Sequence, residues 1–278
     1  MMINFKDYLT EAKKKKTKSR KDRFTWKDGD VTVTKSKELH EKTIYGKSFD
    51  EPHHERENIN HDDRDSRNKA KIATDQKFSD EGEEHHKKLS AEYAEHGRKL
   101  SPEHHNSVAV YKGPMYKAIN HPLRHNGEQH KHEHYRLADE EHKKHVERLD
   151  HVTGNHKTTK AMHVYRGFDG HNIHHLDKGD VLHDKGYTST TVKHNRTNTF
   201  SSWDTAKHDG KEKRVVAKIH VPKGTKGYYL DNEAHTHGSM AEKEFLLHRG
   251  THFKVLGHTH DPVTDTHTVH MKVHKQDD

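Results

Sequence analysis

Two acidic residues, one arginine and a run of hydroxyl side chains are the parts of this sequence best suited to chemistry. Glu242 and Glu244 are separated by one residue, Arg166 stands in a Y-R-G triplet, and the segment 188–191 reads TSTT. On a strand, residues i and i+2 point to the same face. We therefore expect the two carboxylates to lie side by side, where mutual repulsion raises the pKa of one of them.

These residue types together suit an anionic glycosidic substrate. Arg166 stays charged at any accessible pH and can bind a carboxylate or a phosphate through two hydrogen bonds. Carboxylates stabilise the oxocarbenium-like state through which a glycosidic bond breaks. Taken singly, each feature has an ordinary explanation: a strand arginine in a salt bridge, the high strand propensity of threonine, or a solvated E-x-E face. Their occurrence in order on three predicted strands favours a site.

The elements that must position these residues fall into two groups along the chain. A helix is predicted over residues 80–97, a second starts at Ser101-Pro102 because serine caps a helix and proline suits its first turn, a third ends irregularly at Pro122, and a fourth covers 133–151. After Gly154 the hydrophobic period approaches two, which predicts strands. They are expected at 162–167, 186–192, 214–221, 227–231, 242–250, 251–258 and 266–274. Helices followed by strands indicate an α+β fold with a mainly antiparallel sheet.

Composition separates the N-terminal part of the chain from the rest. The 278 residues are 27% hydrophobic and 34% charged, so the apolar residues must concentrate in one folded portion. Residues 1–12 show one short amphipathic helix face. The segment 13–79 is basic and polar, and we expect it to be largely disordered, with short local structure around Phe24, Trp26 and Val31. The net charge of +7 suits an acidic partner or simply favours solubility.

Several classes of protein are excluded by what the sequence lacks. There are no cysteines, so disulfides and thiolate metal sites are ruled out. No apolar run approaches the ~18 residues of a membrane span, and the N-terminus has no secretory apolar region. The dinucleotide-binding G-x-G-x-x-G and the Walker A loop are both missing.

The three motifs, in this order, resemble those of the R-S-E class of ADP-ribosyltransferases. Y-R-G is followed by the hydroxyl run, then by E-x-E, a hydrophobic stretch and R-G-T-x-F-x-V. This class includes arginine-modifying bacterial toxins, vertebrate ecto-enzymes and enzymes of T-even-type phages. The resemblance extends upstream to Tyr111-Lys112-Gly113, Tyr116, Ala118-Ile119-Asn120 and Leu123-Arg124, and it covers roughly 80–278. Thr191 and His248 depart from the usual pattern, in which serine and proline are common at these positions.

The resemblance implies a site for NAD as the substrate. Arg166 would hold the NAD phosphates, and the backbone of Gly167 would face the nicotinamide amide. Residues 193–204, including Phe200, would border the phosphate and nicotinamide side. No metal is required, because the leaving nicotinamide is already activated as a pyridinium.

The resemblance also implies the catalytic and acceptor roles. Glu244 would be the catalytic glutamate, Ser189 would orient it, and Thr190 would support the pocket. Glu242 would serve the arginine acceptor, whose guanidinium has a pKa above ~12 and needs a nearby base. The segment 231–241 would recognise the acceptor.

The implied protein is an arginine-specific mono-ADP-ribosyltransferase with its catalytic domain at 80–278. That domain would have two packed sheets with a cleft between them and an N-terminal helical lobe. The acceptors would be arginines of host transcription or translation proteins. No membrane partner is expected.

A second resemblance concerns the first twelve residues. F-K-D-Y-L-T-E-A is similar to the capsid-targeting leader of internal head proteins of T-even-type phages, with a cut expected after Glu11. This leader would place the protein inside the virion and then in the host cytoplasm. The basic segment 13–21 would then suit contact with DNA phosphates.

Two alternatives to an enzyme stay open. The chain has 35 histidines, and sets such as His130/His132/His134, His235/His237 and His258/His260 have spacings compatible with metal binding. A histidine-rich metal-binding protein is one alternative. A basic, non-catalytic DNA-packaging protein of the phage head is the other.

Overall fold

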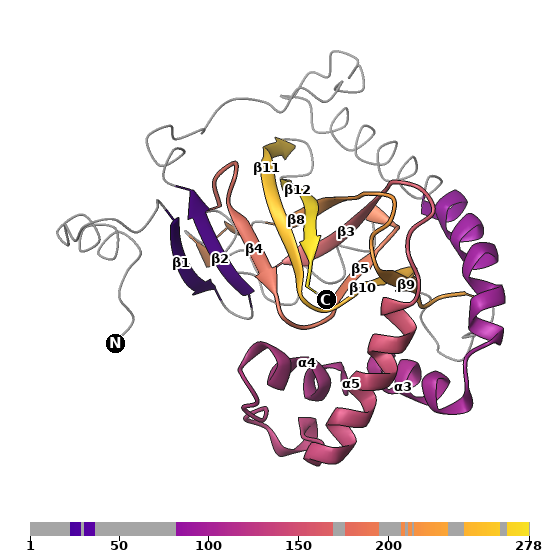
Figure 1. The fold of residues 1–278 in the computed structure, drawn as a ribbon. Coiled ribbons are helices and arrows are strands. Elements are labelled where there is room, and N and C mark those ends of the chain that lie inside the picture. Colours follow the sequence, from indigo (N-terminus) through magenta and orange to yellow (C-terminus); the bar gives the residue numbers. More distant parts are fainter. Residues whose placement is uncertain are drawn as a thin grey trace.

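The computed structural model describes residues 23–28, 31–36, 82–168, 176–194, 207–208, 211–212, 214–232, 242–261 and 266–277. Most of the strands follow the helices, as predicted, and the fold is α+β (Figure 1). Phe200, residues 1–12, where a leader was expected, and most of the segment 13–79 lie outside the described residues.

The helices come first among the well-packed elements. An unlabelled helix over 82–98 is followed by α3 (Pro102–Lys112), α4 (Tyr116–Arg124), the short 3-10 helix η2 (Glu133–Tyr135) and α5 (Asp139–Gly154). Ser101 and Pro102 begin α3 as predicted, whereas α4 continues for two residues beyond Pro122. None of the described helices is both long enough and apolar enough to cross a membrane.

The strands are β1 (Arg23–Asp28), β2 (Val31–Ser36), β3 (Met162–Phe168), β4 (Val181–Asp184), β5 (Thr188–Thr191), β6 (Lys207–His208), β7 (Lys211–Glu212), β8 (Arg214–Val221), β9 (Gly227–Tyr229), β10 (Glu244–Leu247), β11 (Thr251–Asp261) and β12 (Thr266–Gln276).

Ten of these strands form one hydrogen-bonded order, β1-β2-β4-β11-β12-β8-β3-β5-β10-β9. The pairs are antiparallel except β8 with β12 among the described strands. The order divides between β3 and β5, which are joined only through the residue pair Tyr165–Thr191. The predicted two-sheet core is therefore present as two halves that meet at a single pair.

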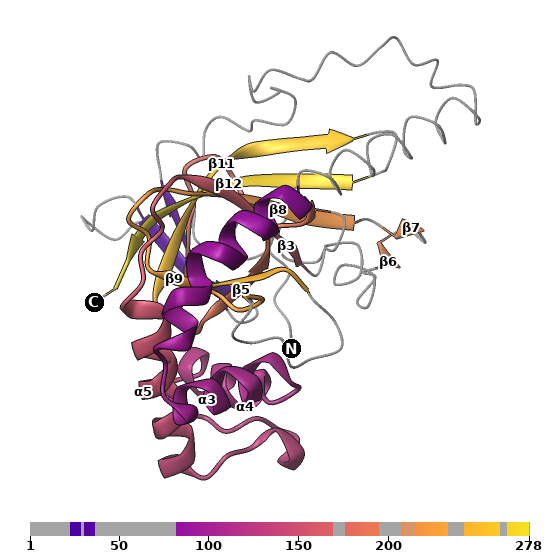
Figure 2. The same ribbon diagram turned by 90° about the vertical axis from the view of Figure 1, so that its right-hand side faces the viewer.

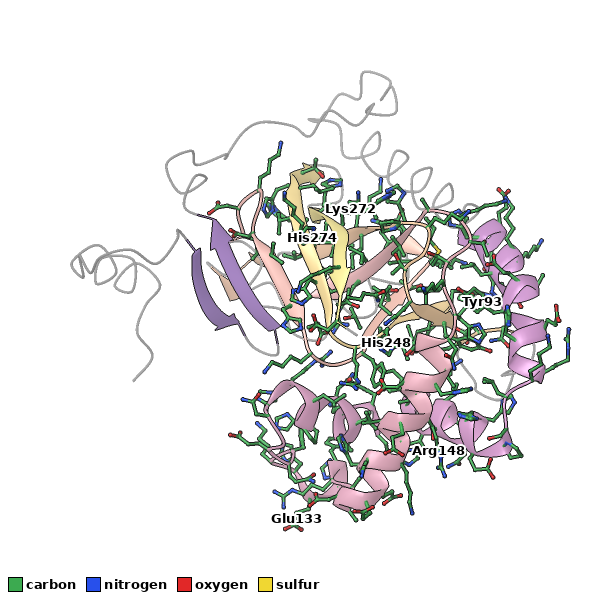
Figure 3. The ribbon with its side chains drawn as sticks, in the orientation of Figure 1. Tyr93, Glu133, Arg148, His248, Lys272 and His274 are labelled. Atoms are coloured by element: carbon green, nitrogen blue, oxygen red, sulfur yellow. The ribbon has the colours of Figure 1, made fainter. Side chains whose placement is uncertain are left out.

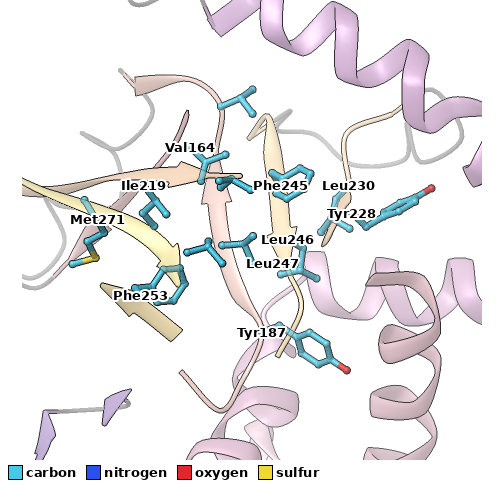
Figure 4. Packing of buried hydrophobic residues seen from close by; sticks show 14 of the residues in the cluster. Val164, Tyr187, Ile219, Tyr228, Leu230, Phe245, Leu246, Leu247, Phe253 and Met271 are labelled. Carbon is cyan, nitrogen blue, oxygen red and sulfur yellow. The ribbon is translucent and has the colours of Figure 1, made fainter. Parts of the chain in front are cut away.

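The core lies against this sheet and is richest around β10. All four residues of β10 are buried, as expected of a short apolar strand that is covered on both faces. On the helical side, the ring of Tyr93 stands edge-on to those of Tyr228 and Phe245, with centroids 5.2 and 6.1 Å apart. Figure 4 shows Phe245, Leu246 and Leu247 in the same cluster as Val164 and Ile219 of the other half.

The helices α3, α4 and α5 form a lobe beside β5, β9 and β10, and the helix over 82–98 runs along the same side of the sheet (Figures 1 and 2). His248, at the end of β10, lies where the sheet meets α5 (Figure 3). It is buried, and its Nδ1 lies 2.7 Å from the hydroxyl of Thr153. The histidine that departs from the usual family pattern thus joins the lobe to the sheet.

The segment 23–36 forms a hairpin of β1 and β2 at one edge of the sheet. It pairs antiparallel with β4 through Thr32–His183, Val33–Leu182 and Thr34–Val181. This is where short local structure was expected within the basic segment 13–79. The hairpin extends the sheet by two strands beyond β4.

Candidate active site

A cleft of about 360 Å³ opens between the helical lobe and the junction of the two sheet halves. Six of the seven predicted site residues line it, namely Arg166, Gly167, Ser189, Thr190, Glu242 and Glu244. The end of α3, the following turn and the start of α4 supply the opposite wall, with Tyr111, Lys112, Gly113, Pro114 and Tyr116. The fold thus brings β3, β5, β10 and α3 together around one space.

Glu244 is the most deeply placed acid of this cleft. It begins β10 and is 4% exposed. Burial raises the pKa of its carboxyl group to about 7, and the nearby charges of Glu242 and Asp231 act in the same direction. A hydrogen bond with the Ser189 side chain and the charge of Lys112 lower the pKa and partly offset this rise. The group is poised to change protonation near neutral pH, as acid-base and electrostatic roles require.

The backbone of Glu244 is fixed by Asp231. The carboxylate of Asp231 accepts a hydrogen bond of 2.7 Å from the Glu244 backbone N–H. Its other oxygen is paired with the ammonium group of Lys112 at the end of α3. Asp231 therefore ties the start of β10 to the helical lobe. The sequence analysis named Asp231 only as the first residue of the expected acceptor-recognising segment. Nothing in the sequence around it predicted that it would connect β10 to α3.

Glu242 reaches the cleft by a different route from the one predicted. The strand starts at Glu244, and Lys243 before it has a φ of 55°. The strand alternation that was expected to align the two carboxylates is therefore wrong at this position. Instead, the Glu242 carbonyl accepts a 2.8 Å hydrogen bond from the Thr191 hydroxyl. Both acids still line the same cleft.

The hydroxyl side chains of β5 have two different kinds of partner, one in the strand pairing and one in the cleft. The Thr190 hydroxyl donates a 2.6 Å hydrogen bond to the Phe245 carbonyl across the strand pair and is buried. Ser189 is half-buried, and its side chain is hydrogen-bonded to the carboxyl group of Glu244. Thr190 thus supports the pocket, and Ser189 contacts the acid.

Arg166 enters the cleft from β3. Its Nη1 donates a 3.1 Å hydrogen bond to the Ser189 carbonyl, which places a permanent positive charge beside the hydroxyl run. Gly167 follows in the same strand and pairs with Val216 of β8. The cleft therefore has a cationic side at β3 and an acidic side at β10.

The upstream residues of the resemblance hold the turn before β5. Arg124 forms two hydrogen bonds of 2.9 Å with the carboxylate of Asp184, and both side chains are buried. Asn120 accepts from the Tyr187 backbone N–H at 2.9 Å and donates to the Tyr111 hydroxyl at 2.9 Å. The helical lobe thereby fixes the residues that lead directly into the TSTT run.

The start of the helix over 82–98 packs against the rim of the site, which the sequence did not predict. Glu83 forms a 2.8 Å ion pair with Lys193 after β5 and lies 3.7 Å from the ammonium of Lys243. His86 lies 2.6 Å from the Tyr229 hydroxyl, and burial lowers the pKa of its imidazole. This helix therefore holds both segments that flank Ser189 and Glu244.

The histidine sets that the sequence offered as metal ligands do not converge in the described residues. His130, His132 and His134 lie in sequence, with neighbouring ring centroids 5.4 and 5.5 Å apart. His258 is hydrogen bonded to the Leu176 carbonyl. His235 and His237 lie outside the described residues.

The fold is that of bacterial ADP-ribosyltransferase toxins. It matches Plx2a, an ADP-ribosyltransferase toxin from Paenibacillus larvae, with a TM-score of 0.51, 18% identity, and coverage of 69% of this chain and 96% of the toxin. It matches C3stau2 from S. aureus, solved with NAD, with a TM-score of 0.52 at 18% identity, covering 69% of this chain and 95% of that one. The C3 exoenzyme of Clostridium limosum gives a TM-score of 0.50 at 20% identity, with 70% and 94% covered.

A sequence model of the ADP-ribosyltransferase exoenzyme family matches residues 88–276. The chain belongs to this family. None of the curated protein sequences matches it. The family match spans α3 to β12 and includes all the residues that line the cleft.

Proposed function

We propose that this protein transfers a single ADP-ribose unit from NAD to arginine side chains of other proteins and releases nicotinamide. The observation that supports this most directly is the cleft itself, in which Arg166, Ser189, Glu242 and Glu244 line one space. Membership of the family supports the reaction class. The structure of C3stau2 with NAD supports NAD as the substrate.

Arg166 and Gly167 bind the substrate in this proposal. The guanidinium can neutralise the pyrophosphate through paired hydrogen bonds, and the Gly167 backbone faces the nicotinamide amide. The glycosidic bond between ribose C1′ and the pyridinium nitrogen breaks, and its electron pair leaves with nicotinamide, which is released neutral. The ribose is left as an oxocarbenium ion.

Glu244 stabilises that cation and binds the ribose 2′-hydroxyl, with Ser189 orienting its carboxylate. The bound pyridinium and the developing oxocarbenium both favour ionised Glu244, which counteracts the burial that raises its pKa to about 7. A carboxylate held in a water-poor site stabilises positive charge more strongly than it would in bulk water. The activity should therefore rise with pH through the range in which Glu244 ionises.

Glu242 serves the acceptor. A nitrogen of the acceptor guanidinium attacks C1′, and Glu242 takes the proton that this nitrogen loses. When water occupies the acceptor position, the same site hydrolyses NAD slowly. Glu242 is thus needed for transfer to arginine, whereas Glu244 is needed for both reactions.

The test uses labelled NAD, a host cell extract and four proteins: wild type, Glu244→Gln, Glu242→Gln and Glu84→Gln. Glu84 is a matched control, because it lies on the exposed face of the helix over 82–98, where it forms an ion pair with Lys88. We expect wild type and Glu84→Gln to label proteins, and hydroxylamine to release the label, as it does for arginine-linked ADP-ribose. Glu242→Gln should retain NAD hydrolysis without arginine transfer, and Glu244→Gln should lose both.

Each outcome decides a separate part of the proposal. Hydrolysis at the wild-type rate in Glu244→Gln would remove Glu244 from the catalytic role. Label that resists hydroxylamine would show that the acceptor is not arginine. The bands labelled by wild type identify the acceptors, which we propose are host transcription or translation proteins.

The virion proposal concerns residues 1–12 and is tested separately. If these residues are a capsid leader, the packaged protein should begin after Glu11, and the mass of its N-terminal peptide would show this. An intact Met1 in the particle would contradict it. Binding of DNA by the basic segment 13–21 would appear as an affinity that falls steeply with salt.

A further inference from the structure

Two histidines and an aspartate meet on the sheet, outside the cleft. His183 of β4 and His252 of β11 face each other in the antiparallel register. Their rings stack, with centroids 3.9 Å apart and an interplanar angle of 7°. The carboxylate of Asp277, just after β12, lies 2.9 Å from His183 Nε2 and 3.0 Å from His252 Nε2.

One of these contacts is not a hydrogen bond. His183 Nε2 is buried and has no hydrogen-bond partner, although a carboxylate oxygen lies 2.9 Å away. The His183 Nε2 therefore lies beside a carboxylate oxygen while its own hydrogen-bonding capacity is unsatisfied. The His252 Nε2 does make a hydrogen bond with the other oxygen, at 3.0 Å.

The surrounding chain holds Asp277 in this position. Its backbone N–H donates a 3.0 Å hydrogen bond to the Gly250 carbonyl. Gly250 has a φ of +70°, and a Cβ added there would lie 2.9 Å from the Asp277 Cβ. The aspartate can approach the two imidazoles because position 250 carries no side chain.

We infer that His183, His252 and Asp277 form a binding site for a divalent zinc ion, separate from the cleft and going beyond the proposed function. The three ligand atoms lie within 4.8 Å of one another. Zinc bonds of ~2.0–2.1 Å in tetrahedral geometry separate ligand atoms by about 3.3 Å. The contacts of 2.9 and 3.0 Å are close to this spacing, and the two stacked rings, whose planes are 7° apart, must turn out of their stack so that both Nε2 atoms point to the ion.

The chemistry of the ligands fits zinc. Imidazole nitrogen and carboxylate oxygen are both common zinc ligands. The Asp277 side chain is 45% exposed, so water can supply a fourth ligand. The Lys275 ammonium, 3.6 Å from the carboxylate, is exposed and contributes little that the ion would not replace.

The bound ion would join the end of β12 to β4 and β11 and so stabilise the sheet. Among the residues that the structure describes, this is the one group of three or more His, Asp or Glu side chains with converging ligand atoms. None of its three members lines the cleft. The ion therefore has a structural role in this inference.

The test is thermal unfolding of the full, untagged chain with and without excess Zn²⁺. The proteins are wild type, His183→Gln, His252→Gln, Asp277→Asn and a control with both His163→Gln and His220→Gln. The control removes a facing histidine pair of β3 and β8 in the same sheet, whose rings are 5.3 Å apart. It corrects for zinc bound by the many other histidines.

We expect Zn²⁺ at about 100 times its Kd to raise the Tm of wild type and of the control by roughly 5 °C. Each ligand variant should lose that shift and bind Zn²⁺ more than about tenfold more weakly. A wild-type Tm that does not respond, or an equal shift in the three ligand variants, would overturn the inference. Asp277→Asn decides the matter if a histidine variant fails to fold, because Asp277 is exposed at the end of the chain.

Discussion

The buried carboxyl group of Glu244 destabilises the folded protein when it is ionised. Its pKa rises from 4.5 to about 7 because it is buried at the start of β10. Each pKa unit corresponds to ~1.36 kcal/mol, so holding this group ionised in the folded protein costs about 3 kcal/mol above neutral pH. The helices and the sheet must supply that free energy elsewhere.

The cost predicts a pH-dependent gain in stability for Glu244→Gln. Since the folded-state pKa of Glu244 is raised, the stability that this side chain gives wild type in its protonated form is fully present below pH 4.5. That stability is lost as the pH rises through about 7. The unfolding free energy of Glu244→Gln, measured relative to wild type, should therefore increase by roughly 2–3 kcal/mol between pH 5 and pH 8. Urea denaturation at the two pH values measures this difference. An equal difference at both, or the same trend in Glu84→Gln, would show that Glu244 does not titrate as stated.

At the level of single residues, the sequence predicted which side chains line the cleft. It did not predict the backbone conformation and contacts that hold them there. Six of the seven predicted site residues line the cleft, because their motifs fall on or beside β3, β5 and β10, which are neighbours in the sheet. The left-handed backbone at Lys243 was not predictable, since lysine has no preference for that conformation. Asp231 was missed because its partner, Lys112, is more than a hundred residues away in the sequence.

Among the elements, the contact between α4 and the turn before β5 is the strongest candidate for stabilising the site. The Arg124–Asp184 pair is buried and makes two hydrogen bonds, and Arg124 also donates to the Tyr187 carbonyl at 3.2 Å. Removing one member of such a pair leaves an uncompensated buried charge.

We therefore expect Arg124→Met to lower the unfolding free energy by about 3–5 kcal/mol and to reduce activity by loosening the turn that leads into Ser189. Lys88→Met is the control, because its ion pair with Glu84 is exposed and should contribute less than about 1 kcal/mol. Chemical denaturation compares the two variants. An equal loss of unfolding free energy in the two variants would mean that the buried Arg124–Asp184 pair stabilises the fold no more than an exposed ion pair does.

The strands that the sequence predicted best are those with long alternation. Strands β8, β11 and β12 are eight to eleven residues long and show it over part of their length. Strand β4 was not predicted, because its four residues, VLHD, alternate only twice and include a histidine and an aspartate. The hairpin of β1 and β2 was expected only as short local structure around Phe24, Trp26 and Val31, because its pairing with β4 is not visible in any local pattern.

At the scale of the whole molecule, the hairpin protects an edge of the sheet. Without it, β4 would present unpaired backbone groups, which are templates for association with another chain. Deletion of residues 1–80 should therefore make the protein associate as its concentration rises, as light scattering after size-exclusion chromatography would show. Deletion of residues 1–20 keeps both strands and should behave like the full chain. Identical behaviour of the two shortened proteins would argue against this protective role.

The position of β12 has a consequence for how the protein is made. This strand lies between β11 and β8 and pairs in parallel with β8, so the middle of the sheet can be completed only after residues 266–276 have been synthesised. Strand β8 and the helical lobe emerge earlier, when their partner has not yet been synthesised. Parallel pairing across such a long stretch of chain is slow to form. Folding of this sheet must therefore wait until residues 266–276 are available, and a shorter nascent chain leaves one edge of β8 unpaired, which favours aggregation.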